Sequence, residues 1–262
     1  MNLLTLNCHS WQEDNQLDKI KVLARIIKDN KYDVIALQEV SQIISGELIS
    51  KLSKENYISI LLEALKALGE TSYKCIWDFS HIGYDIYEEG LAIITRHKIK
   101  EWKSFYVSKD TNIKNYKTRK IIEAKIEVNN KDYKFYSCHL GWWDDLEEPF
   151  KDQVDKLIDS LDKKYINIIM GDFNNDALIR NEGYDYLLSK GLFDTYYLAR
   201  EKGERFTVEG KIDGWEDNKS SKVLDFILVN EKVNVVESKI IFNNKNEVKV
   251  SDHYGVQVKI EV

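Results

Sequence analysis

Polar side chains that could act on a phosphate ester follow short apolar segments at four points in the chain. Asn7 follows LLTL, Glu39 follows DVIALQ, His139 follows YKFYSC and Asp172 follows INIIMG. Apolar segments of this length are typical of buried strands, and catalytic groups are common where such strands end. Carboxylates, an amide and an imidazole brought together there would form a site for a hard metal ion with an acid/base partner. That combination suits phosphate ester hydrolysis.

The segment GDFNND places an acid and an amide two residues apart. On an extended chain Asp172 and Asn174 would point the same way, toward one substrate. The carboxylate could accept a proton from water, and the amide could donate a hydrogen bond to an oxyanion. The alternative is an ordinary turn. Glu39 is similarly open to two interpretations, a ligand of a hard cation or a solvated acid at a strand end.

A third group of candidates lies near the C-terminus. The SDH segment contains Asp252 and His253, which offer an oxygen and a nitrogen on opposite faces of the chain. Asp225 is an unusual acid at the head of the apolar segment LDFILV. If it is buried it needs a partner, and a histidine that it orients is a good candidate.

The elements that must position these residues alternate at first and then become mostly strands. Apolar patterns predict helices near residues 17–27, 60–68, 150–161 and 184–189. They predict strands at 3–6, 33–38, 73–78, 90–95, 102–107, 121–128, 133–138, 166–170, 223–229, 235–242 and 254–260. Two sheets flanked by helices would account for this order, as an α/β sandwich.

Composition limits the classes of partner. The 262 residues are 43% hydrophobic, enough for one large domain, and with a single proline and no low-complexity linker we expect one domain over residues 1–262. The net charge of −6 and the pI of about 5.5 give no support for extended nucleic-acid binding, although a local basic cleft could coexist with them. No segment is apolar enough to cross a membrane. The three cysteines have no regular spacing, and the first ten residues lack a signal-peptide pattern, so we expect a cytoplasmic protein.

The motifs together resemble those of the endonuclease/exonuclease/phosphatase superfamily. The resemblance runs over nearly the whole chain, in family order, through LNCHSW, LQEV, EEGLAIITRH, SCHLGWW, GDFNND, LDFILV and SDHYGV. GDFN followed by a C-terminal SDH is the most specific part. The resemblance implies a four-layer α/β/β/α sandwich of two mixed sheets and Mg²⁺-dependent phosphoester hydrolysis, with Mn²⁺ as an alternative ion.

The same resemblance implies a role for each candidate. Glu39 would bind the metal ion with help from Asn7 and Asp252. Asp172 would activate or orient the attacking water, and Asn174 would contact the phosphate. His253, oriented by Asp225, would stabilise charge on the phosphoryl group, and His139 matches a phosphate-contacting histidine of the phosphatase and phospholipase branches.

Local sequence strings and individual side chains indicate which substrate to expect. The strings NCHSWQEDN, HIGYDIYEEGLAI and CHLGWWDDLEEPF are most similar to the bacterial maltose 6'-phosphate phosphatase branch. Trp142 and Trp143 could stack on a sugar ring, or they could anchor their loop in the core. Arg119 could clamp the phosphate, or it could be a solvated charge. Tyr84 could line the leaving-group side, with packing as its alternative.

We therefore predict a phosphatase for a small phosphorylated sugar, with no protein partner inferred. The rival is a metal-dependent nuclease or other phosphodiesterase of the same fold. A nuclease needs a basic, aromatic-lined groove, and here the Lys and Arg residues are dispersed. A lipid phosphodiesterase and a catalytically inactive binding protein are weaker alternatives.

Overall fold

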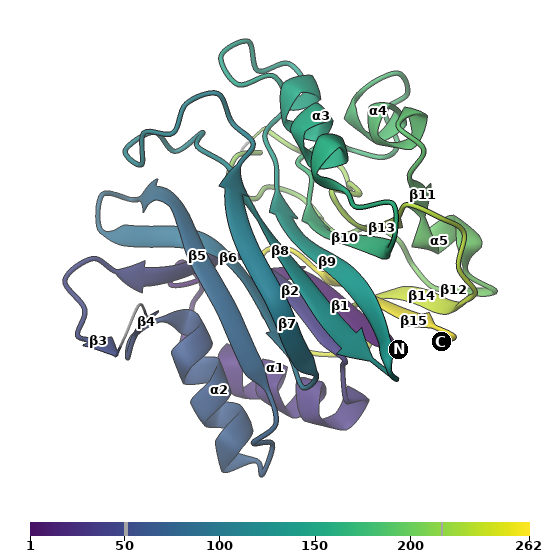
Figure 1. The fold of residues 1–262 in the computed structure, drawn as a ribbon. Coiled ribbons are helices and arrows are strands. Elements are labelled where there is room, and N and C mark those ends of the chain that lie inside the picture. Colours follow the sequence, from purple (N-terminus) through teal and green to yellow (C-terminus); the bar gives the residue numbers. More distant parts are fainter. Residues whose placement is uncertain (50–51, 216) are drawn as a thin grey trace.

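Two β-sheets packed face to face form the centre of the molecule, with helices on both outer faces (Figure 1). The computed structural model describes residues 1–49, 52–215 and 217–262. The layers follow the order helix, sheet, sheet, helix, and both sheets are mixed. This confirms the α/β/β/α sandwich predicted from the sequence.

The first sheet contains both ends of the chain. Its seven strands run in the order β12-β14-β15-β1-β2-β6-β5. Their bounds are β1 Asn2–Asn7, β2 Val34–Ile43, β5 Lys74–Gly83, β6 Tyr87–Thr95, β12 Glu201–Lys202, β14 Val235–Ile241 and β15 Gly255–Ile260. The first and last long strands, β1 and β15, pair antiparallel, and β1 pairs parallel with β2. Segments from the two ends of the chain therefore lie side by side in this sheet.

The second sheet has six strands in the order β11-β13-β10-β9-β8-β7. Their bounds are β7 Lys98–Tyr106, β8 Lys120–Val128, β9 Lys131–His139, β10 Ile166–Asp172, β11 Phe193–Asp194 and β13 Asp225–Val229. A separate hairpin consists of β3 Leu48–Ile49 and β4 Leu52–Ser53. Strands β9 and β10 pair parallel, so their carboxyl ends lie together.

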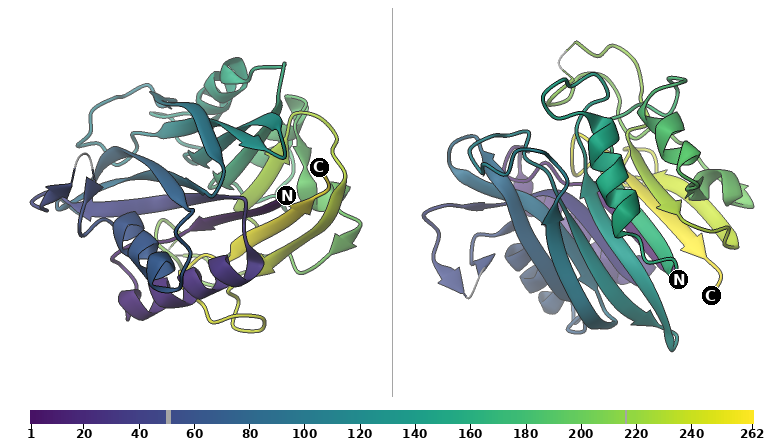
Figure 2. Two further views of the ribbon diagram at one scale, coloured as in Figure 1. Left: turned by 60° about the horizontal axis from the view of Figure 1, so that its bottom comes forward. Right: turned by 45° about the horizontal axis from the view of Figure 1, so that its top comes forward.

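The helices cover the outer faces because each carries one apolar stripe. Helices α1 (Gln16–Asn30) and α2 (Tyr57–Ala67) pack on the seven-stranded sheet, and α3 (Phe150–Ser160) and α4 (Gly183–Ser189) pack on the six-stranded sheet (Figure 2). A short helix, α5 (Thr195–Leu198), lies against β13 and β14. A third apolar cluster fills the space between the sheets. Burial of these three clusters is the main force that holds the layers together.

Most of the predicted elements are confirmed, and the differences are short or shifted elements. The strand expected at 102–107 begins earlier, at Lys98. Residues 98–101 are mostly polar, so no apolar pattern marks them as part of the strand. The two-residue strands β3, β4, β11 and β12 and the four-residue helix α5 were not predicted, since segments so short carry no periodic pattern. Over the described residues, no helix is both long and apolar enough to span a membrane.

Candidate active site

Strand ends position the central acid. Asp172 is the last residue of β10, and across the sheet it lies in register with His139 of β9 on one side and Asp225 of β13 on the other. Gly171 makes this close approach possible, because a Cβ atom at that position would lie 2.0 Å from the carbonyl oxygen of Cys138. The glycine of GDFNND is thus needed for β10 to pack against β9 where the site begins.

A bulge in β2 positions Glu39. The sequence predicts a strand that ends before this residue, at Gln38, whereas the strand continues to Ile43 with a register shift against β6 between Leu37 and Val40. Glu39 sits in the shift with a φ of 53°. A bulge reorients side chains locally, so the carboxylate points into the site while the strand goes on.

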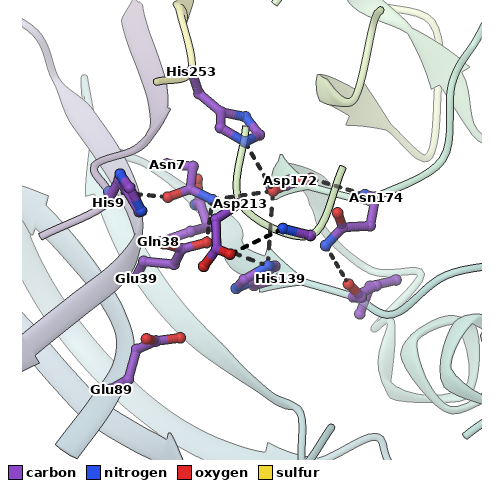
Figure 3. A network of polar contacts seen from close by, with 12 residues as sticks. Asn7, His9, Gln38, Glu39, Glu89, His139, Asp172, Asn174, Asp213 and His253 are labelled. Atoms are coloured by element: carbon purple, nitrogen blue, oxygen red, sulfur yellow. Dashed lines mark hydrogen bonds and ion pairs between the residues drawn. The ribbon is translucent and has the colours of Figure 1, made fainter. Parts of the chain in front are cut away.

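The side chains from the two sheets converge (Figure 3). The amide nitrogen Nδ2 of Asn7, at the end of β1, donates to Glu39 Oε1 at 2.7 Å and to Asp172 Oδ2 at 3.1 Å. His139 Nε2 lies 3.9 Å from Glu39 Oε1 and 3.7 Å from Asp172 Oδ2. Asn7 therefore bridges the two carboxylates with its nitrogen, while its oxygen accepts from the backbone N–H of His9.

An acid–imidazole–acid chain completes the centre. His253 Nδ1 lies 2.9 Å from Asp225 Oδ2, and its Nε2 lies 3.8 Å from Asp172 Oδ2. Because a carboxylate only accepts hydrogen bonds, the contact with Asp225 places a proton on Nδ1. The expectation that Asp225 orients His253 agrees with this geometry.

Electrostatics separate the roles of these groups. Burial and the neighbouring Asp225 raise the pKa of Asp172 to about 6. Burial opposes the charged form of His253, but Asp225 and Asp172 outweigh it and hold its pKa well above the usual range. Burial and the charge on Arg119 hold the pKa of His139 well below its usual range, so that this imidazole is neutral. The arrangement supplies one charged imidazole and one carboxylate that can accept a proton near neutral pH.

The acid groups fit a divalent cation. Burial, followed by the charge of Glu89, raises the pKa of Glu39 to about 8. Among the described residues, no Lys or Arg forms an ion pair with Glu39. Ligand atoms of Glu39, His139 and Asp172 lie within 4.8 Å of one another. A hard cation bound by these oxygens would relieve the unfavourable burial of charge, and oxygen-rich donor sets favour Mg²⁺ or Mn²⁺.

Asp252 lies beside His9 and is not among the residues that line the main cavity. Its Oδ1 is 3.6 Å from His9 Nδ1, and His9 also contacts Glu13 at 2.9 Å. Asp252 lines a neighbouring hollow, and Tyr84 lines both this hollow and the main cavity. Its expected support of the metal ion stays a prediction, as does metal binding by Asn7.

The centre opens into one cavity of about 590 Å³. The residues that line it, besides those of the centre and Asn174, come from β5, β6 and four loops: His81, Gly83, Tyr84, Glu89, Tyr116, Arg119, Trp142, Asp213 and Gly214. Of the predicted substrate-binding residues, Tyr84, Arg119 and Trp142 lie here. The hydroxyl group of Tyr84 donates to Asp213 Oδ2 at 2.5 Å.

Arg119 is buried, with only 4% of its surface exposed. One of its terminal nitrogens donates to the carbonyl oxygen of Tyr116 at 2.6 Å, and its Nε has no hydrogen-bond partner among the described residues. Its Cζ lies 5.8 Å from the centre of the Trp142 ring. The alternative of a solvated surface charge does not agree with this burial.

Trp143 corrects the sequence-based expectation. Its ring packs against Phe150 of α3 and Tyr186 of α4, with Lys151 Nζ 4.7 Å from the ring centre, and it is not among the cavity-lining residues. The interpretation of an anchored loop therefore describes Trp143, while Trp142 points to the cavity. The two tryptophans are adjacent in one loop and their side chains point to opposite sides of it, so only one of them can reach the cavity.

Two acids that line the cavity, Glu89 and Asp213, are not among the site residues predicted from the sequence. Glu89 of β6 approaches His81, with 3.3 Å between Oε1 and Nε2. The acid pair before the apolar segment GLAIIT was the signal that could have found it. Asp213 lies in a polar loop that has no apolar pattern beside it, so the sequence offers no comparable signal for it.

Comparison with known proteins agrees with this geometry. A model of the endonuclease/exonuclease/phosphatase family matches residues 4–253, and the chain belongs to that family. No curated protein sequence matches it significantly. A family member from Leptotrichia buccalis C-1013-b has a similar solved structure, with a TM-score of 0.94, 42% identity and 100% coverage of both chains.

More distant structures share the fold. A mannosyl-6-phosphatase from Bacteroides thetaiotaomicron VPI-5482 is 18% identical with a TM-score of 0.72 and 100% coverage of both chains. D. rerio TDP2, solved with a single-strand DNA product, is 15% identical with a TM-score of 0.69, covering 100% of this chain and 99% of that one. Family membership and the acid and imidazole groups together support metal-dependent phosphoester hydrolysis.

Proposed function

We propose that this protein is a phosphomonoesterase that uses Mg²⁺ or Mn²⁺ to hydrolyse a phosphorylated sugar, with maltose 6'-phosphate as a candidate substrate. The observation that carries the proposal is the buried Arg119. Among the described residues that line the cavity it is the one Lys or Arg, and no carboxylate forms an ion pair with it. A single buried guanidinium group in the cavity that Asp172 and His253 also line suits one terminal phosphate.

The rest of the cavity suits a polyol leaving group. Glu89 and Asp213 offer acceptors for hydroxyl groups, and Trp142 and Tyr84 offer aromatic faces for a sugar ring. The same acids repel a second phosphate, which disfavours a polynucleotide. A volume of about 590 Å³ is within the range of small-molecule sites.

In the proposed reaction Asp172 accepts a proton from the attacking water. His253, held by Asp225, stabilises the charge that develops on the phosphoryl oxygens, and Arg119 holds the phosphate in place. A divalent cation held by Glu39 would supply Lewis-acid polarisation of a phosphoryl oxygen. The neutral His139 has one N–H group, which can donate a hydrogen bond to a phosphoryl oxygen.

A substrate screen tests the proposal. Phosphate release would be measured from mono- and disaccharide phosphates, nucleotides and an aryl phosphate, with cleavage of abasic DNA measured in parallel, each with Mg²⁺, Mn²⁺ or chelator. We expect metal-dependent release, fastest from a sugar phosphate. Cleavage of abasic DNA with negligible sugar-phosphate turnover would instead support the nuclease alternative.

We place this activity in cytoplasmic carbohydrate metabolism. The sugar phosphate is the partner that the proposal requires, and it requires no nucleic acid, membrane or protein partner. The single catalytic domain expected over residues 1–262 is part of the same proposal.

A further inference from the structure

A tryptophan outside the catalytic group contacts one of its members. Trp215 lies in the loop between β12 and β13, and its indole Nε1 donates to the side-chain oxygen Oδ1 of Asn174 at 3.2 Å. At the other end of the same amide, Asn174 Nδ2 donates to the carbonyl oxygen of Leu140 at 3.0 Å. An indole N–H only donates and a backbone carbonyl only accepts, so these two contacts fix which end of the amide carries the nitrogen.

The fixed orientation matters because Asn174 lines the catalytic cavity. Its backbone N–H donates to Asp172 Oδ1 at 2.8 Å (Figure 3). Only 6% of the surface of the residue is exposed. One hydrogen of Nδ2 goes to Leu140, and the second has no acceptor among the described residues. A rotated amide would place its oxygen beside the Leu140 carbonyl, where two acceptors repel each other, and would lose the donor to a phosphate.

The indole ring is itself held in place. Lys222 Nζ lies 4.8 Å from its centre, and the ring packs beside the small apolar cluster of Val208, Ile212 and Leu224. A donor that is anchored before the substrate arrives needs little reorganisation during the reaction, and such preorganised donors contribute strongly to catalysis.

We propose that Trp215 is a positioning residue, which locks the Asn174 amide so that its free N–H group points to the phosphate that reacts at Asp172. The proposal rests on the phosphoester hydrolysis proposed above and adds a residue to it. It assigns the Trp215 side chain to orientation of the amide rather than to contact with the sugar.

The first test is Trp215→Phe, which keeps an aromatic ring and removes the N–H donor. On an aryl phosphate, which has no sugar ring, we expect kcat to fall by about three- to tenfold, the effect of one hydrogen bond, with KM nearly unchanged. Inhibition by orthovanadate, which resembles the transferring phosphoryl group, should weaken by a similar factor. Trp102→Phe, at an exposed tryptophan of β7, is the matched control and should leave kcat unchanged.

A double-mutant cycle separates positioning from general damage. In an Asn174→Ala background, Trp215→Phe should cause no further loss of kcat, because the amide that it positions is gone. Equal and additive losses in the two backgrounds would overturn the proposal, as would an unchanged kcat for Trp215→Phe alone.

A measurement independent of turnover distinguishes the failure of this inference from failure of the proposed function. In ¹H–¹⁵N spectra the side-chain NH₂ signals of Asn174 should be sharp in the native protein and should broaden or shift toward exposed-amide positions in Trp215→Phe. Unchanged signals would overturn the positioning role. A native protein that hydrolyses no phosphomonoester, yet shows this spectral change, would instead contradict the proposed function.

Discussion

At the scale of single residues, the candidate site consists of acids whose burial would be costly without partners. Asp225 is buried against His253, and Asp172 is buried between His253 and His139. Each carboxylate thus lies near an imidazole, which offsets part of the desolvation free energy. Burial of such groups in a cavity is common at catalytic sites, where perturbed pKa values serve the reaction.

The first prediction concerns the proposed base and the charged imidazole. Asp172→Ala and His253→Ala should each lower kcat by about 10² or more, the usual contribution of proton transfer or charge stabilisation. Steady-state kinetics on folded, purified variants would check this, with circular dichroism as the control for folding. Near-normal turnover in either variant would remove that residue from the chemistry.

The second prediction concerns the metal ion. Glu39→Gln keeps the volume and one oxygen acceptor but removes the charge that attracts a cation. We expect the Mg²⁺ activation curve to shift to higher concentration, with turnover at saturating metal less affected. The measurement is initial rate against free Mg²⁺ concentration. Superimposable curves for the native protein and the variant would place Glu39 outside the metal shell.

At the scale of secondary-structure elements, polar contacts join strands that are far apart in sequence. Asp33, just before β2, accepts hydrogen bonds from the backbone N–H of Asn2, from Arg96 at 2.7 Å and from His97 at 2.7 Å. The same carboxylate therefore ties β1 and β2 to the turn that follows β6. This cluster lies away from the cavity, so its effect should be on stability alone.

The third prediction follows from the Asp33 carboxylate. Burial raises its pKa, but His97, Arg96 and Asn2 outweigh burial, so its folded pKa lies below its ordinary value. Its stabilisation is therefore present above about pH 4, the unfolded value, and is lost as the pH falls through the folded value. Asp33→Asn should lower the free energy of unfolding by about 2 kcal/mol at pH 7, with a smaller difference below pH 4.

Denaturant titrations at several pH values would measure this difference. Asp29→Asn, at an exposed position of α1, is the matched control and should change the stability little. If the loss of unfolding free energy caused by Asp33→Asn grew as the pH falls, the predicted direction of the pH dependence would be wrong.

The fourth prediction separates the two neighbouring tryptophans. Trp143→Ala should lower the free energy of unfolding by about 2 kcal/mol, since its ring packs between α3 and α4, and it should leave KM unchanged. Trp142→Ala should raise KM for a sugar phosphate by roughly tenfold, the loss of one stacking contact, and affect an aryl phosphate far less. Thermal unfolding and parallel kinetics on both substrates would reveal an exchanged pattern if the assignment is wrong.

At the scale of the whole molecule, the site exists only where the two sheets meet. Asn7 and Glu39 come from the seven-stranded sheet, whereas His139, Asp172 and Asp225 come from the six-stranded sheet. The hydrogen bond from Asn7 to Asp172 joins residues 165 positions apart. Partial unfolding of either sheet would therefore abolish the site, which couples activity to the global fold.

The fifth prediction concerns the surface charge. A net charge of −6 should prevent tight binding of a polyanion, since favourable counterion release requires clustered Lys and Arg. Fluorescence anisotropy with a labelled abasic duplex should show no saturable binding at physiological salt. Tight binding that weakens steeply with added salt would favour the nuclease alternative.

The sequence alone determined the layers of the fold and the chemistry of its centre. The apolar periodicity of segments such as 166–170 is a local property, and GDFNND followed by SDH resembles the motifs of the endonuclease/exonuclease/phosphatase family. These features depend only on short segments of the sequence, so they could be predicted without a structure. The same is true of Asp225, whose position at the head of an apolar strand already required a partner.

Only the tertiary structure decided how the loops contribute. Four features depend on residues distant in sequence: the bulge at Glu39, the inward position of Glu89, the contact of Trp215 with Asn174 and the packing of Trp143 against α3 and α4. Loop conformation is set by the surfaces that the loop meets, and no periodic pattern records those surfaces. The local sequence could therefore specify the metal-dependent chemistry, whereas the shape of the leaving-group side arises when the two sheets and their loops pack together.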